Sequence, residues 1–493
     1  MAVSKVYFTR PELSALLPQY ETIRHVLAGE YVVKSHREKY LTNPSPDDEA
    51  RYQMYLDRAM FYPAARRTLT GLVGDVFNKK PVIELPTNLQ KLVDNANGSG
   101  VGLVQHSKKS LAQTVAFSRM GLLVDFPQAP EDGITADNKD RYYPTIHAFA
   151  PHHIINWRCD LIGSEYKLTL VVIYEPYEEI GDDGFEVTNR PQYRVLRLND
   201  GVYTSEIWRS PTPLQWNYER PTTGDFNLLS HTFSFPLDNN GEPFDEIPFT
   251  FIGGENNDPN PDNPAFYDIA RVALSHYASS ADYEEGVYVC GQPTLGIIGA
   301  DAEWEKRNKG KVRMGSRGGI NVRMGGDIKL VQAQGNSMAF ESMQYKERVL
   351  VSLGARLVQD KQVQRTAFEA KLEAASTGSA LSSAAFNVQE AYLKILKLAC
   401  RFTGDNPESI KFELNTDFQL AAMSSDDRAQ TQSEYREGLL TFGEARTVLK
   451  LGGVAYEEDD IAQREIDEAA EKDFERAVKN ANAMAGPENE PTQ

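Results

Sequence analysis

Hydrophobic residues along the chain follow a helical period, then a period of two, then a helical period again. Residues 1–126 place apolar side chains three and four positions apart, which indicates amphipathic helices. Residues 140–252 alternate apolar and polar side chains and are rich in β-branched and aromatic residues. Helical spacing returns after residue 263. This order predicts an α+β protein whose antiparallel sheet lies between two helical parts of the chain.

Local signals divide the N-terminal helical part. Ser45 is expected to cap a helix, because Pro46 follows at the first helical position and acids face the positive end of the helix dipole. That helix is predicted to continue to Phe77, with a kink at Pro63. A second helix is predicted over 101–119.

The segment with a period of two predicts several strands. YKLTLVVIYE (166–175) has the composition of a buried strand. YRVLRL (193–198) and VYTSEIWR (202–209) predict a hairpin, because Asn199-Asp200-Gly201 between them tolerates the positive φ of a tight turn. Three further strands are expected, over 121–126, ending at 239–241, and over 247–254, with a linker over 253–264.

Two helices are predicted after the linker. Asn263 is expected to cap the first, with Pro264 at its first position, and Ser337 is expected to start the second. The apolar stripe of the first is Phe266, Ile269, Ala270, Ala273 and Tyr277, and the apolar face of the second is Met343, Leu350, Leu353 and Leu357.

A long helix and an acidic helical region follow. Thr366 and Glu369 form a capping box that opens a helix ending near Phe402, with a bend at 376–379. Its apolar stripe is Leu381, Ala385, Val388, Tyr392, Ile395 and Ala399. Residues 427–480 are helical and acidic in pattern, with a capping box at Thr441 and Glu444, and 481–493, which ends in AGPENEPTQ (485–493), is expected to be disordered.

Charge and composition exclude some classes of function. The 493 residues include 52 Lys and Arg against 70 Asp and Glu, for a formal net charge of −18. Such an acidic chain is a poor candidate for a general, tight binder of nucleic acid, because its overall field repels phosphate. The three cysteines form no CxxC unit, and no apolar run is long enough to cross a membrane. We therefore expect a soluble protein made inside the cell.

The chain offers little catalytic or cofactor chemistry. Gly98-Ser99-Gly100-Val101-Gly102 lacks the spacing of a phosphate-binding loop, so a turn before the next helix is the favoured interpretation. His147, His152, His153 and Cys159 raise a zinc hypothesis, but adjacent histidines on a strand would point to opposite faces. The sequence contains no GxSxG or HExxH motif. We predict no enzyme activity, no cofactor and no metal.

One basic, glycine-rich stretch reverses the local charge. Its members are Lys306, Arg307, Lys309, Lys311, Arg313, Arg317, Arg323 and Lys329, with Asp327 as the one acid in the range. The stretch is either a solvated loop or a surface that faces DNA or an acidic partner through salt-sensitive attraction.

An ordered set of segments resembles the portal protein family, the head-to-tail connectors of tailed double-stranded DNA bacteriophages. The set spans roughly residues 7 to 455 and is specific as a series rather than segment by segment. It comprises EARYQMYLDRAMFYPAARRTLTGLVGDVFNKKP (49–81), NGSGVGLVQ (97–105), GLLVDFP (121–127), YRVLRLNDGVYTSEIWR (193–209), IPFTFIGG (247–254), PAFYDIARVALSHYASSADYEEGVYVCGQPTLGIIG (264–299), TAFEAKLEAASTGSALSSAAFN (366–387), LNTDF (414–418) and GLLTFGEARTVLKLGG (438–453).

The resemblance implies the portal fold and a division of the chain into named parts. A portal subunit has a wing of helices and sheet, stem helices, a clip, a long kinked inner helix and a helical crown. In this numbering the parts are the wing over 1–260, a stem helix over 261–289, the clip and returning strand over 290–335, a second stem helix over 336–357, the tunnel loop over 358–364, the inner wing helix and following strand over 365–426, the crown over 427–480 and the tail over 481–493.

The resemblance also implies a non-enzymatic role in the virion, after synthesis in the cytoplasm of the bacterial host. Portal subunits form a ring, typically of twelve, at one capsid vertex, which serves genome packaging and ejection. Implied partners are the large terminase that hydrolyses ATP, capsid or scaffolding protein, a head-tail adaptor or tail proteins, and double-stranded DNA passing through the channel. No membrane partner is implied.

Within that expectation, specific residues become candidates. Lys361 and Arg365 are the candidate DNA contacts in the channel, and the basic stretch from Lys306 to Arg323 is the candidate docking surface for the terminase and adaptor. Twelve copies would carry a formal charge of about −216, so an acidic lining would let DNA slide while ring assembly would depend on salt.

Two alternatives remain open from the sequence. The first is another phage head structural protein, such as an adaptor or minor capsid protein. The second is a soluble intracellular hydrolase with a β-rich domain. Both would form smaller particles than a ring of twelve 55.2 kDa subunits.

Overall fold

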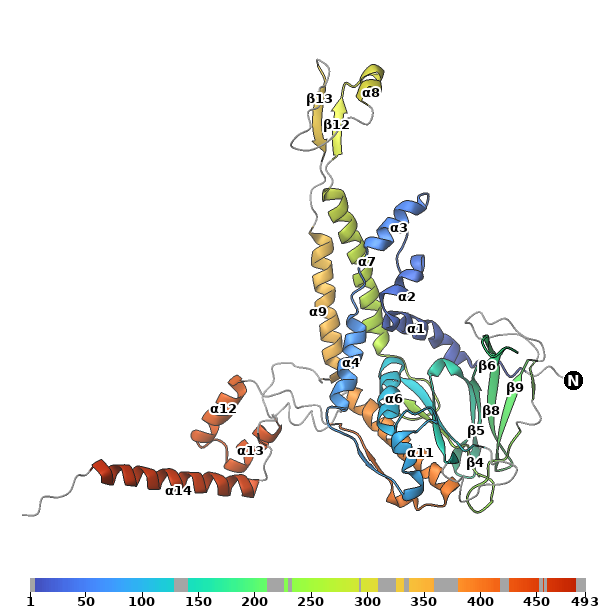
Figure 1. The fold of residues 1–493 in the computed structure, drawn as a ribbon, viewed down its shortest axis with the longest axis vertical. Coiled ribbons are helices and arrows are strands. Elements are labelled where there is room, and N and C mark those ends of the chain that lie inside the picture. The colour runs from blue at the N-terminus through green and yellow to red at the C-terminus, as the bar shows by residue number, and fades with distance from the viewer. Residues whose placement is uncertain are drawn as a thin grey trace, which may run out of the picture. The chain divides into compact units, whose positions relative to one another are not determined.

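The computed structural model is a mixed α+β protein with several small sheets (Figure 1). The chain divides into two compact units, residues 1–416 and 417–493. No helix among the described residues is long and apolar enough to span a membrane. The structure describes residues 5–127, 141–210, 226–228, 233–291, 294–308, 325–331, 337–358, 380–416, 425–451, 455 and 459–484.

The first unit begins with helices. Two of them, α3 and α4, occupy the segment where the sequence predicted one helix. The helices are α1 (Pro11–Ala28), α2 (Glu30–Ser35), α3 (Glu49–Arg58), α4 (Ala64–Val76), α5 (Lys91–Asp94) and α6 (Leu103–Phe117), with short 3-10 turns at Arg37–Lys39 and Thr87–Leu89.

The predicted start of the 45–77 helix and its predicted continuation through Pro63 were wrong. Asp48, rather than Ser45, caps α3, because its carboxylate accepts a hydrogen bond from the backbone N–H of Arg51 at 3.0 Å. Asp48 can do so because it directly precedes the first helical residue. At Pro63 the helix is interrupted rather than kinked: α3 ends at Arg58 and α4 begins just after the proline. Proline fits the start of α4 because no N–H is needed there.

Antiparallel pairing joins the strands into two larger sheets. The five-stranded sheet has the order β10-β9-β8-β5-β4, and the three-stranded sheet has the order β11-β2-β3. Their strands are β2 (Arg119–Asp125), β3 (Thr145–Phe149), β4 (Ile154–Ile162), β5 (Glu165–Tyr174), β8 (Gln192–Asn199), β9 (Val202–Arg209), β10 (Asn227–Leu228) and β11 (Phe249–Gly253).

The predicted hairpin is confirmed. Asn199 pairs with Val202 across the turn, and Asp200 and Gly201 both have positive φ, at 49° and 80°. Both φ values match a type I′ connection, which suits the right-handed twist of the two strands. The segment at 239–241 is also a turn, but its flanks form only an isolated bridge between Leu237 and Pro243, not the predicted strand.

Three smaller two-stranded sheets and a 3-10 turn complete the β structure. The 3-10 turn at Pro151–His153 precedes β4. The pairs are β1 (Val82–Glu84) with β14 (Lys411–Glu413), β6 (Tyr177–Ile180) with β7 (Val187–Arg190), and β12 (Thr294–Ile298) with β13 (Asp327–Val331).

The helix α11 (Ala380–Thr403) packs against α6 and the three-stranded sheet, and its predicted apolar stripe is confirmed. Leu381, Ala385, Val388, Tyr392, Ile395 and Ala399 are all buried. A 3-10 turn at Pro407–Ser409 leads from α11 to β14. The predicted Thr366–Glu369 capping box and the bend at 376–379 lie outside the described residues.

The remaining helices of the first unit are α7 (Phe266–Gly291), α8 (Ala302–Asn308) and α9 (Met338–Val358). The first predicted stripe is confirmed, because Phe266, Ile269, Ala270, Ala273 and Tyr277 are buried. In α9 Leu350 is buried, whereas Met343 and Leu353 are half-buried.

The second unit contains α12 (Ser425–Arg436), α13 (Phe442–Leu451) and α14 (Asp459–Met484). The predicted capping box is confirmed: the Glu444 N–H donates to Thr441 Oγ1 at 3.3 Å, and the Thr441 N–H donates to Glu444 Oε2 at 2.9 Å. Helix α14 continues to Met484, so residues 481–484 are helical where disorder was expected.

Candidate functional site

The long helices α7 and α9 form an antiparallel pair, although the residues between them in the chain include α8 and the two-stranded β12–β13 sheet (Figure 1). The direction follows from the contacts. Lys346 of α9 reaches Ser275 and Ser279, whereas Phe340, one to two turns earlier in α9, lies beside Tyr283, further along α7. Residue numbers therefore rise in one helix as they fall in the other.

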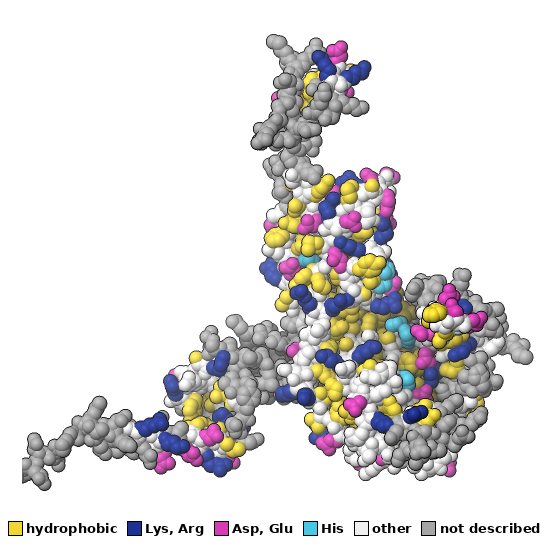
Figure 2. Space-filling model, in the orientation of Figure 1, with side chains coloured by type: hydrophobic (Ala, Val, Ile, Leu, Met, Phe, Trp, Pro, Cys, Tyr) yellow, Lys and Arg dark blue, Asp and Glu magenta, His cyan; other side chains and the backbone are white. Residues whose placement is uncertain are grey.

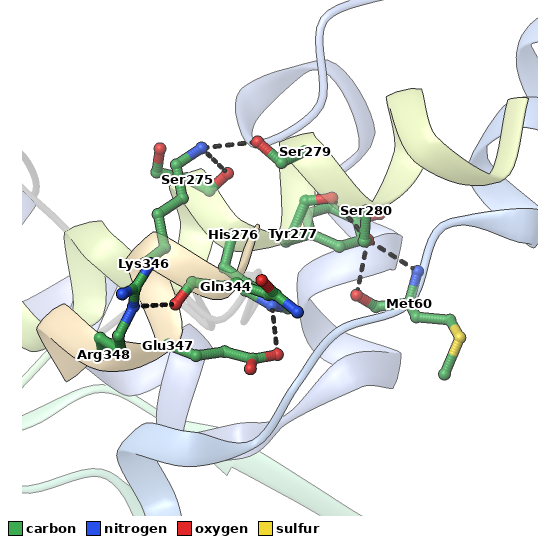
Figure 3. A network of polar contacts seen from close by, with 10 residues as sticks. All are labelled: Met60, Ser275, His276, Tyr277, Ser279, Ser280, Gln344, Lys346, Glu347 and Arg348. Atoms are coloured by element: carbon green, nitrogen blue, oxygen red, sulfur yellow. Dashed lines mark hydrogen bonds and ion pairs between the residues drawn. The ribbon is translucent and has the colours of Figure 1, made fainter. Parts of the chain in front are cut away.

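A lysine joins the two helices at the centre of the pair (Figure 3). The Lys346 ammonium donates to the Ser275 carbonyl oxygen at 3.0 Å and to Ser279 Oγ at 2.5 Å. Burial lowers the pKa of Lys346, while the nearby Asp282 carboxylate opposes that effect. One charged side chain thus bridges successive turns of α7 and fixes the register of α9 against it.

The next residue of α9 makes a second connection. Glu347 Oε1 lies 3.3 Å from His276 Nε2, which becomes an ion pair when the imidazole is protonated. His276 is buried, and its Nδ1 has no hydrogen-bond partner among the described residues. Tyr62, just before α4, lies over the same ring at 5.8 Å between centroids.

The segment before α4 is held to α7 by a serine (Figure 3). The Met60 N–H donates to Ser280 Oγ at 3.0 Å, and Ser280 Oγ lies 2.7 Å from the Met60 and Tyr277 carbonyl oxygens. The segment between α3 and α4 is not helical, so these bonds satisfy backbone groups that a helix would have satisfied itself.

Charged groups hold α3 to the same helix. Arg58 forms a short ion pair with Glu285, and Arg51 lies 3.7 Å from the same carboxylate. The Tyr55 hydroxyl donates to Asp282 Oδ1 at 2.7 Å, and burial raises the pKa of Tyr55. Helix α7 is therefore bonded to both α3 and α9.

An open groove of about 760 Å³ lies between α4 and α9. Gln344, Glu347, Arg348 and Val351 are spaced three and four residues apart, which puts them on one face of α9. The two helices lie close together at Gly354, where a Cβ would lie 3.0 Å from Thr68 Cγ2. The lining residues are Tyr62, Ala64, Arg67, Thr68, Gln344, Glu347, Arg348, Leu350 and Val351.

Large apolar side chains stand exposed on this helix pair. Met338, Tyr345 and Val351 of α9 are 71%, 61% and 73% exposed, and Val287, Tyr288 and Val289 near the end of α7 are also exposed. Figure 2 shows hydrophobic side chains interspersed with acidic and basic ones along the helix pair. These exposed apolar side chains are available for contact with another protein.

Of the basic candidates, the structure describes Lys306 and Arg307. Both are exposed in the last turn of α8, whose first turn carries Glu303 and Glu305. Arg307 pairs with Glu303 at 3.3 Å, so this helix is balanced in charge rather than uniformly basic. Lys329 lies in β13 opposite Gly296. The others, Lys309, Lys311, Arg313, Arg317 and Arg323, and both channel candidates, Lys361 and Arg365, lie outside the described residues.

The structure also locates the residues of the zinc and phosphate hypotheses. His147 lies in β3, His152 and His153 lie in the 3-10 turn, and Cys159 lies in β4. These four do not form a cluster with metal-ligand geometry among the described residues. The glycine-rich segment is a turn, as favoured: Gly98 and Gly100 have positive φ, and Gly102 precedes the first residue of α6.

The sequence interpretation missed the tertiary part of this site. Lys346, Ser280 and the groove residues of α4 have no motif, because their roles depend on helices that are distant in sequence. One available signal was the presence of three serines, Ser275, Ser279 and Ser280, beside the apolar stripe of α7. Small polar residues there leave room for a partner helix and offer hydrogen bonds to it.

Comparison with known proteins gives three findings. A family model described as a domain of unknown function (DUF4055) matches residues 265–403, from α7 through α11, which is less than a third of the chain. No curated protein matches. Among solved structures, the chain is similar to a chain in the virion of a native gene transfer agent (GTA) particle, at 14% identity and a TM-score of 0.38, covering 85% of this chain and 98% of that one. It is also similar to a chain in the neck of an empty GTA particle, at 14% identity and a TM-score of 0.38, covering 79% and 90%.

Proposed function

We propose that this chain is the portal subunit of a tailed, phage-like particle and that it closes into a ring, typically of twelve copies. In this proposal the ring sits at one vertex of the capsid and is the channel through which DNA enters and leaves. The protein itself is non-enzymatic, and the terminase supplies ATP hydrolysis.

The observation that carries the proposal is the helix–sheet–helix order at the centre of the chain. Helices α7 and α9 run antiparallel in contact, and the chain between them includes the two-stranded β12–β13 sheet and α8. A stem of two helices with a clip between them is what the resemblance of residues 7–455 to portal proteins implies. In this proposal the helices and strands before α7 form the wing, α11 is the inner wing helix, and the helices of the second unit form the crown.

The exposed residues of the helix pair supply a rationale for ring closure. Closed rings require two different surfaces on each subunit, one for each neighbour. The apolar side chains of α9 and the groove between α4 and α9 are candidates for such contacts, since they combine apolar area with charged groups of both signs. We propose that the neighbouring copy of this chain covers them.

The remaining assignments follow from the same proposal. Lys361 and Arg365 would face DNA in the channel, and the basic stretch from Lys306 to Arg323 would dock the terminase and later the adaptor or tail proteins. Capsid or scaffolding protein would contact the outside of the ring. The net charge of −18 per subunit would keep DNA from binding tightly as it passes.

Electron microscopy of the purified full chain tests the proposal. The expected images are annular particles with rotational symmetry and a central hole wide enough for a DNA duplex. Compact particles without an opening, at every protein and salt concentration tried, would contradict the ring and favour an adaptor, a minor capsid protein or a hydrolase.

A further inference from the structure

A cluster of metal-ligating side chains lies away from the helix pair, where α1 meets the end of α2. Glu21 and His25 are four residues apart on α1, so they share one face of that helix. His36 directly follows α2 and returns to the same place. One ligand atom from each of the three side chains lies within 4.8 Å of the other two, and His25 Nε2 is 3.9 Å from Glu21 Oε1.

The hydrogen bond of His36 Nδ1 leaves the other ring nitrogen, Nε2, available as a ligand. Its Nδ1 lies 2.8 Å from the Val32 carbonyl oxygen, which can only accept, so Nδ1 carries the proton. In the neutral ring Nε2 then has a free lone pair. A metal-binding histidine usually has this arrangement, with the second ring nitrogen donating to a backbone carbonyl.

His25 has a comparable partner. Its Nδ1 lies 2.7 Å from the Tyr40 hydroxyl, and the Thr22 side chain, which also hydrogen-bonds Tyr40, donates in turn to the Pro18 carbonyl at 2.9 Å. Metal binding at His25 Nε2 requires the tautomer in which the Nδ1–H donates to the Tyr40 oxygen, and the 2.7 Å distance allows it.

The two imidazole rings are held close together. Their centroids are 3.8 Å apart at an interplanar angle of 34°. His25 is 6% exposed, so its ring is shielded from solvent. Two imidazoles and a carboxylate in one place are the donor set that Zn²⁺ and related transition-metal ions prefer.

One cation competes for the carboxylate. Lys39 Nζ lies 2.7 Å from Glu21 Oε1, and Lys39 is itself exposed. A metal ion would have to displace or share this contact. The exposed lysine can move into solvent at little cost. The three ligand atoms must also close to the separations of about 3.3–3.5 Å that bonds of 2.0–2.1 Å at a tetrahedral ion require.

We propose that Glu21, His25 and His36 bind one transition-metal dication of the Zn²⁺ class, with the fourth position left to water. The ion would link α1 to the end of α2 across the turn at Gly29 and so stabilise the N-terminal helices. This site is independent of the proposed ring.

Titration of tag-free, chelator-treated full-length protein with Co²⁺ tests the site, because tetrahedral Co²⁺ has a visible absorption band that reports its ligands. The expected result is one ion per chain, displaced by Zn²⁺, and an affinity at least about 10-fold lower in His36→Gln. The matched control is His152→Gln, since His152 also lies against a second histidine, at 4.4 Å between ring centroids, without a converging carboxylate. The control should bind Co²⁺ as the parent does.

Three outcomes would overturn the proposal. They are absence of the visible band up to about 1 mM Co²⁺, equal affinity in the parent and in His36→Gln, and an equal loss in His36→Gln and His152→Gln. Because His36 is only half-buried, its substitution should leave the fold intact, and a thermal unfolding curve of each metal-free variant checks this directly.

Discussion

Replacing Val351 by Asp should prevent ring assembly without unfolding the subunit. Val351 lies in α9 beside the groove and is 73% exposed in the isolated chain. Complete burial of a valine contributes about 1.5 kcal/mol, so covering the exposed part contributes about 1 kcal/mol at each interface. An aspartate there must also lose water from its charge, which adds several kcal/mol if no cation pairs with it. A loss of about 3 kcal/mol or more lowers the association constant on the order of 100-fold at each contact.

The assay is particle mass against protein concentration for the parent, Val351→Asp and a matched control. Ile162→Asp is the control, because Ile162 is also an exposed apolar residue but ends β4 in the five-stranded sheet. Valine and aspartate have similar helix propensities, so the melting temperature of the Val351→Asp subunit should change little. If Val351→Asp assembles at the same concentration as the parent, α9 is not part of the subunit contact and the reasoning fails.

Other predictions concern the core. Burial lowers the pKa of His106, which is 4% exposed, to about 4, so between pH 6.5 and 4 the unfolded chain binds a proton that the native chain does not. The free energy of unfolding should therefore fall by up to about 3 kcal/mol as pH drops from 6.5 to 4. Thermal unfolding of His106→Gln should show a smaller dependence on pH. Tyr392→Phe should cost about 1–3 kcal/mol in thermal unfolding, because the Tyr392 hydroxyl lies 2.6 Å from His106 Nδ1, and an unchanged Tm would contradict that bond. Gly286 of α7 has open space around it, so Gly286→Ala should raise the free energy of unfolding by about 0.5–1 kcal/mol. Gly354→Ala should raise it less, because the added Cβ would meet Thr68. Equal shifts in Tm for the two variants would argue against the close approach of α4 and α9.

Local sequence signals predicted those parts of the fold that depend on neighbours in the chain. The stripe of α11, the turn at Asp200 and Gly201 and the capping box at Thr441 each follow from residues within one or two turns of helix or one hairpin. At Pro63 the sequence predicted a kink where the structure has a break, and the backbone of Met60 in that break is bonded by Ser280 of α7, which is distant in sequence.

The candidate site was harder to predict for the same physical reason. Lys346 has no sequence feature that distinguishes it from a solvated lysine until Ser275 and Ser279 are brought beside it. The groove needs α4 and α9, which are far apart in sequence. The charge count over the basic stretch did not include Glu303, which precedes the counted range and pairs with Arg307.

The mass of the purified, assembled particle tests the central proposal most directly. Twelve subunits of 55.2 kDa give about 660 kDa. Mass photometry over a range of salt concentrations measures this mass in solution. A dominant species near 660 kDa is the predicted result. A species that stays between one and four subunits, about 55–220 kDa, under all conditions would contradict the proposal that these chains close into a ring.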